Sequence, residues 1–279
     1  MLSALLIVFR EVIEAGLIVG IVLAATAGVP RRGRFVMFGV TGGVAGACLV
    51  AAFAGELASL FQGSGQELFN ASILLLAVSM LTWHNVWMAS HGRQMARALK
   101  EAGLEVSSGK RTLAALSIVV GVAVLREGSE VVLFLYGIIA QGGTSNAALA
   151  AGGAMGLVAG AAVSALMYFG LLTIPAHRLF AVTSGLITLL AAGMAAQAVL
   201  FLQNGGYVNM LTDTVWNTSW LLPEDGVAGR LLHTLVGYSD APDGAQIIAY
   251  VATIALIMGL MRLVGTRRHG PRPAPVPAE

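Results

Sequence analysis

The chain has 279 residues, of which 57% are hydrophobic and 11% are charged, and its mean hydropathy is +0.82. Soluble domains contain about 45–50% apolar and about 25% charged residues, so this composition excludes an ordinary soluble protein. It predicts an all-α integral membrane protein. The formal net charge of +2 says little by itself, and the single cysteine, Cys48, excludes an internal disulfide and a cysteine metal cage.

Apolar runs separated by polar or basic segments predict seven transmembrane helices, because a helix needs about 20 apolar residues to cross a bilayer. The first run, residues 2–28, lacks a basic segment at its start and stays apolar beyond Glu14. We therefore interpret it as a spanning helix rather than a cleaved signal peptide. The other predicted spans are residues 35–61, 68–90, 113–140, 145–174, 179–202 and 245–264.

Two charged clusters interrupt the first and fourth of these spans, at Arg10–Glu14 (R-E-V-I-E) and at Arg126–Glu130 (R-E-G-S-E). On a helix, the arginine and two glutamates of each cluster project within roughly a quarter-turn of one another. A charge that faces lipid costs about 2.5 to 3.5 kcal/mol, so we expect both charged faces to turn inward. The nine residues before Arg10 give about 14 Å of helix, which predicts a site near the membrane midplane.

The two clusters belong to an internal repeat of three spans. Gly39 and Gly43 in the second span recur as Gly156 and Gly160 in the fifth, and such small-residue pairs favour close packing, here against the cluster helices. Three is an odd number of spans, so the second unit would be inverted relative to the first. The predicted units are 1–90, the first repeat; 91–112, a basic cytoplasmic loop; 113–202, the second repeat; 203–244, an external acidic loop; 245–264, the seventh span; and 265–279, a cytoplasmic tail.

The distribution of basic residues predicts the orientation in the membrane. Apart from Arg10 and Arg126, every Lys and Arg except Arg230 falls in alternate connections, starting with the one after the first span, in the tail, or, for Arg262, at the tail end of the last span. Basic residues concentrate on the cytoplasmic side, so we expect the N-terminus outside and the C-terminus inside.

Four carboxylates in two facing clusters provide hard oxygen ligands for a multivalent cation. Each arginine can hold a glutamate one turn away ionised and oriented. A further acid, Glu67, stands at the outer start of the third span. The predicted metal-binding residues are Glu11, Glu14, Glu67, Glu127 and Glu130, with Arg10 and Arg126 in support.

One histidine, His84, lies within the third span. His84 could ligate a metal, but a lone histidine in a span more often hydrogen-bonds a neighbour, so we expect a hydrogen bond there.

The paired motifs in this arrangement resemble the R-E-x-x-E signatures of the oxidase-dependent iron transporter family, which contains fungal and bacterial iron permeases. The resemblance extends to Gln66–Phe69, to Leu81–Trp83 and to Leu235–Tyr238. It implies iron uptake across the cytoplasmic or plasma membrane, with iron as the substrate, no cofactor, and the motif glutamates as iron ligands. It also implies an extracytoplasmic partner that oxidises or delivers iron, a ferroxidase or a periplasmic protein. Asn70 replaces the second acid of the family's E-x-F-E motif.

Alternatives remain open at this stage. The same oxygen ligands would accept lead or manganese, and buried Arg–Glu pairs would also suit a structural or redox membrane subunit. An enzyme is not expected, because the chain has neither an H-E-x-x-H nor a G-x-S-x-G motif. Nothing predicts nucleic-acid binding. The 203–244 loop, long enough to be functional, is expected to fold partly on the outer membrane surface and to receive the iron-delivering partner.

Overall fold

The computed structural model describes residues 1–60, 65–141, 144–171, 176–224 and 226–266. Within these ranges the regular structure is helical, apart from one isolated bridge between Thr214 and Asp243. The expected all-helical class is confirmed. The helices are α1 (Leu2–Ala25), α2 (Arg32–Leu60), α3 (Gln66–Ser107), α4 (Leu113–Gln141), α5 (Asn146–Tyr168), α6 (Ala176–Asn204), α7 (Val227–Val236) and α8 (Gly244–Thr266).

By length and composition, five of the described helices are able to cross a membrane. They are α2, α3, α5, α6 and α8, whose most apolar windows reach mean hydropathies between 1.4 and 2.2. The protein is therefore a multi-pass membrane protein. The helices that carry the charged clusters, α1 and α4, are 24 and 29 residues long, but three ionisable side chains interrupt each of them. Seven spans and the orientation of the termini stay predictions.

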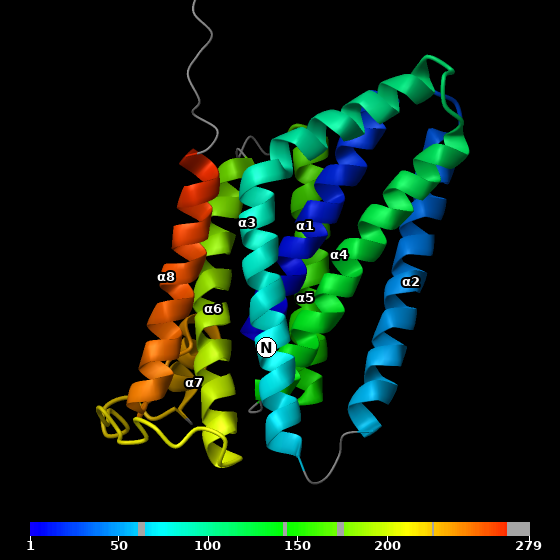
Figure 1. Ribbon diagram of the computed structural model, residues 1–279. Coiled ribbons are helices and arrows are strands. Elements are labelled where there is room, and N and C mark those ends of the chain that lie inside the picture. The colour runs from blue at the N-terminus through cyan, green and yellow to red at the C-terminus, as the bar shows by residue number, and fades with distance from the viewer. Residues whose placement is uncertain (61–64, 142–143, 172–175, 225, 267–279) are drawn as a thin grey trace, which may run out of the picture.

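The long helices lie side by side in one bundle, and α3 is longer than the span expected within it (Figure 1). The helix continues through most of the segment 91–112 to Ser107, and its last part leans across the end of α1 (Figure 1). There Ser107 Oγ donates a hydrogen bond to the carbonyl of Ala25 at 2.9 Å. Since α4 begins shortly after this contact, α4 starts where α1 ends, and the two charged helices run antiparallel.

Glycines bring α2 into close contact with α4. A Cβ added at Gly39 would lie 2.6 Å from the carbonyl oxygen of Ser117, and one at Gly43 would lie 2.7 Å from that of Gly121. Real Cβ atoms do not approach a backbone so closely, so only glycine permits this packing. From Gly39 to Gly43 the contacted residue on α4 moves from Ser117 to Gly121, so α2 and α4 run in the same direction.

The same arrangement joins α5 to α1. A Cβ added at Gly156 would lie 2.5 Å from the carbonyl oxygen of Leu5, and one at Gly160 would lie 2.9 Å from that of Phe9. One turn earlier, Gly152 packs against the carbonyl of Met1. The expected packing of both glycine pairs on the charged helices is confirmed.

The sequence pairs Gly39 with Gly156 as equivalent positions of the repeat, and this pairing is wrong by one helical turn. Gly39 contacts Ser117, whose equivalent in the first half is Met1, and the glycine that contacts Met1 is Gly152.

The contacts relate the two halves of the bundle to each other. Met1 and Leu5 on α1 correspond to Ser117 and Gly121 on α4, with the same offset that separates the two charged clusters. Each charged helix is therefore held by the second helix of the other half.

Two apolar clusters flank the charged region. The first joins α1, α3, α4, α6 and α8, and its buried members include Leu74, Leu81, Phe134, Met194 and Ile257. The second joins α1, α2, α3 and α4 nearer the far end of α3, and its buried members include Val22, Val36, Leu99, Leu116 and Val120.

The connection between α6 and α8, expected as an external loop, contains the short helix α7. Its C-terminal Gly237, at φ 71°, contacts Gly193 in the middle of α6, where a Cβ added at Gly193 would lie 2.5 Å from the Gly237 Cα. The Tyr250 hydroxyl of α8 donates to the carbonyl of Val236. This connection therefore re-enters the bundle beside α6 instead of lying wholly outside it.

The glycine packing between α2 and α4 predicts opposite effects for two neighbouring substitutions. Gly43→Ala should destabilise the protein by about 1–3 kcal/mol, because its Cβ would press on the backbone of α4. Gly42→Ala meets no atom within 4 Å and should be neutral or stabilising by up to about 1 kcal/mol. Thermal unfolding in detergent compares the two, and equal shifts would contradict this account.

Candidate metal centre

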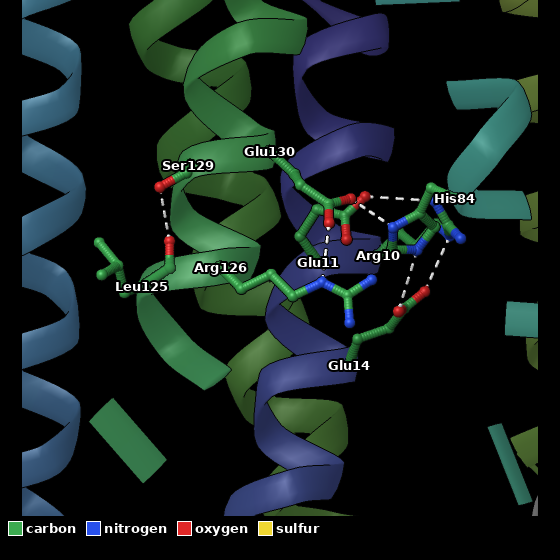
Figure 2. Close-up of polar contacts among 8 residues, drawn as sticks. All are labelled: Arg10, Glu11, Glu14, His84, Leu125, Arg126, Ser129 and Glu130. Carbon is green, nitrogen blue, oxygen red and sulfur yellow. Dashed lines mark hydrogen bonds and ion pairs between the residues drawn. The ribbon is translucent and has the colours of Figure 1, made fainter. Parts of the chain in front are cut away.

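The first charged cluster is fully buried and paired along α1. The Arg10 side chain is 1% exposed, with its Nη1 3.2 Å from Glu11 Oε1 and its Nε 3.0 Å from Glu14 Oε1. These three side chains share one side of the helix, as the spacing predicts (Figure 2). Within this buried cluster one basic side chain therefore pairs with two acidic ones, and solvent does not separate them.

The second cluster, on α4, is built less symmetrically. Arg126 Nε donates to Glu130 Oε1 at 3.1 Å, and the guanidinium lies 4.4 Å from the centre of the Trp87 ring. Its side chain is 35% exposed, whereas Glu127 is buried and has no arginine ion pair within the described residues. The two arginines thus occupy very different environments, although the sequence gives them equivalent positions.

His84 of α3 connects the two clusters (Figure 2). Its Nε2 lies 3.1 Å from Glu14 Oε2 on α1, and its Nδ1 contacts Glu130 Oε2 on α4. The expected hydrogen bond to a neighbour is confirmed. The central position of this histidine was missed, because the repeat marks only α1 and α4, and α3 shows one histidine in an apolar run.

Four buried side chains bring possible metal ligand atoms within 4.8 Å of one another: Glu11, His84, Glu127 and Glu130. Glu11 Oε2 and Glu127 Oε2 are buried and accept no hydrogen bond from the described residues. Buried polar atoms are nearly always satisfied, so these oxygens are suited to a cation. Carboxylate and imidazole together are donors that iron, zinc and nickel accept.

Three of the five expected metal-binding glutamates therefore meet in one place, while two lie elsewhere. Glu14 is adjacent but pairs with Arg10 and His84. Glu67 begins α3, seventeen residues before His84, which is about 25 Å of helix. It lies beside Gly205 at the end of α6, where a Cβ would be 3.4 Å from Glu67 Cβ.

A cavity of about 1,050 Å³ lies between α1, α3, α6 and α8. Arg10, Glu14 and Asn85 line it near the charged cluster, and most of the remaining lining is apolar. The cluster therefore borders this cavity on one side and a packed apolar core on another.

Comparison with known proteins identifies the family of the chain. The model of the Iron permease FTR1 family matches residues 1–268. The chain belongs to this family. The resemblance to iron permeases expected from the R-E-x-x-E motifs is confirmed.

Two curated relatives show the extent of the similarity. A protein described as "Ferrous iron permease EfeU" from Escherichia coli O6:H1 is 30% identical over 269 residues, covering 95% of this chain and 96% of the relative. A protein of the same description from Yersinia pestis is 31% identical over 253 residues, covering 88% and 87%. No solved structure matches the chain.

The unequal environments of the two arginines predict unequal effects on stability. Arg10→Met removes the one ion-pair partner that buried Glu11 has among the described residues and should cost about 3–5 kcal/mol. Arg126→Met should cost clearly less, because Glu130 keeps its contact with His84 when the arginine is lost. Denaturant unfolding of both purified variants measures the difference. Equal losses would show that the structural asymmetry has no energetic consequence.

Proposed function

We propose that this protein is a permease that moves ferrous iron through a site made by Glu11, His84, Glu127 and Glu130. The observation that carries the proposal is the convergence of these four buried side chains from three helices on one point. Both relatives are described as ferrous iron permeases, which supports ferrous iron as the transported ion. Iron is the substrate here, and no catalytic reaction or resident cofactor is required.

The donor set favours a divalent cation over a monovalent one. Four glutamates face two arginines in the two clusters, so the site carries excess negative charge before an ion enters. Arg10 keeps Glu14 oriented, and Arg126 does the same for Glu130. The imidazole of His84 adds a borderline nitrogen ligand, which suits iron better than calcium or magnesium.

We further propose that α1 and α4 cross the membrane with the other five long helices, giving seven spans. On this arrangement the two halves are inverted, the N-terminus is outside, the C-terminus is inside, and the metal site lies near the midplane. The antiparallel charged helices and the matching glycine contacts support this plan. It is the plan of many secondary transporters, whose sites lie where the repeats meet.

Glu67 is proposed to serve at the outer entrance rather than in the central site. Glu67 Oε2 and, near the end of α6, Gln203 Nε2 are buried without a partner among the described residues. The same outer end carries the connection between α6 and α8, in which Trp220 is 80% exposed. This connection is the proposed contact for an iron-oxidising or iron-delivering protein, and the proposed location is the cytoplasmic or plasma membrane.

Iron uptake into vesicles tests the central site. Glu127→Gln and Glu130→Gln should each lower radio-iron uptake by about tenfold or more, because each replaces a carboxylate ligand with a neutral amide of similar shape. Glu105→Gln is the control, since Glu105 is exposed, pairs with Arg111 and lies near the end of α3. Uptake retained in both site variants, at equal insertion, would refute the site and favour structural ion pairs.

The role of His84 is tested by equilibrium binding instead of flux. His84→Gln keeps a polar side chain but loses the imidazole nitrogens, and it should weaken ferrous iron binding by roughly 10- to 100-fold. X-ray absorption of bound iron should show imidazole scattering in the wild type and none in the variant. Unchanged affinity, with no imidazole signal in the wild type, would show that His84 only connects the helices.

A further inference from the structure

The cavity beside Glu14 extends from the site in one direction only. Its α1 lining runs from Arg10 to Ile21, and its α3 lining runs from Asn85 to Leu99. Both sets proceed toward the C-terminal ends of these helices, where Ala25 meets Ser107. On the proposed orientation, this is the cytoplasmic end of the bundle.

The corresponding region on the other side of the site is filled. There α3, α4 and α6 pack tightly, with Phe134 and Ala191 fully buried and Met194 pressed against Gly137. Because the two halves correspond to each other, an equal packing would be expected on both sides. Instead one side is open and its counterpart is closed, which is how one state of an alternating-access pair would look.

Asn85 supplies the second observation. Its side chain is 1% exposed, it lines the cavity, and neither its amide nitrogen nor its amide oxygen has a partner among the described residues. An unsatisfied buried polar group costs about 1–3 kcal/mol. Water or a hydrated cation in the cavity would satisfy both atoms, and a lipid chain would satisfy neither.

We infer that the cavity is a water-filled exit vestibule and that Glu14 and Asn85 form a second, transient site for a divalent cation at its floor. This inference rests on the proposed function. His84 contacts Glu14 directly, so an ion leaving the central cluster reaches the Glu14 carboxylate next. The amide oxygen of Asn85 adds a neutral ligand, which binds weakly enough to release the ion into the vestibule.

Cysteine labelling tests the vestibule without using iron. In a Cys48→Ala background, Ser184→Cys places a thiol on the α6 lining of the cavity. Ala191→Cys is the matched control, because it lies seven residues further along the same face of α6 but in the packed region. A membrane-impermeant thiosulfonate reagent is applied to either side of oriented vesicles.

The inference predicts that Ser184→Cys reacts from the cytoplasmic side only, and that Ala191→Cys reacts from neither side. Reaction of Ser184→Cys only with a lipid-soluble reagent would mean that lipid fills the cavity and would overturn the inference. Reaction from the outer side would overturn it as well. Because this readout needs no transport, its failure is distinguishable from failure of the proposed function.

The second site is tested by separating flux from affinity. Asn85→Leu should lower iron uptake several-fold while the equilibrium affinity of the central site stays the same, and Asn85→Asp should preserve uptake. Thermal unfolding confirms that both variants are folded. Unchanged uptake in Asn85→Leu, or a parallel fall in uptake and affinity, would overturn the role of Asn85.

Discussion

The structure depends on a balance of charge inside an apolar bundle. Glutamates from α1 and α4 face one another with little access to solvent, and each would repel the other if left alone. Arg10, Arg126 and His84 reduce that repulsion. Glu11 Oε2 and Glu127 Oε2 have no hydrogen-bond partner among the described residues, and they are part of the proposed cation site. On the proposed function, stability and ion binding are linked, because the same grouping of buried acidic side chains that is costly to fold would attract a cation.

The surrounding helices are arranged to hold the charged faces together. Glycines allow α2 to lie against α4 and α5 to lie against α1, so each charged helix is fixed by the opposite half of the bundle. The cavity and the packed region opposite it lie in corresponding parts of the two halves, and we infer from this difference that the site is open to one side only. A transporter needs this property, because access to its site must change sides while the site itself persists.

The candidate site was predictable in part. The R-E-x-x-E spacing fixed which helices carry charge and which residues share a face, and three of the expected glutamates do converge. The central position of His84 could not be predicted, because it depends on how α3 packs between α1 and α4. The separation of Glu67 from the cluster could have been estimated from its distance along α3. The glycine equivalent to Gly39 was predicted one turn too late, as Gly156, because the sequence comparison matched glycines by identity and not by the residues that they contact.

The sequence by itself determined the membrane setting, the helical class, the two charged faces and the small-residue pairs, because composition and helical periodicity are local properties. The tertiary structure alone decided that α3 supplies the histidine between the clusters and that α7 returns into the bundle beside Gly193. It also decided that one side of the site is hollow. These features arise from contacts between residues far apart in the chain, whose energies depend on how whole helices pack rather than on any local pattern.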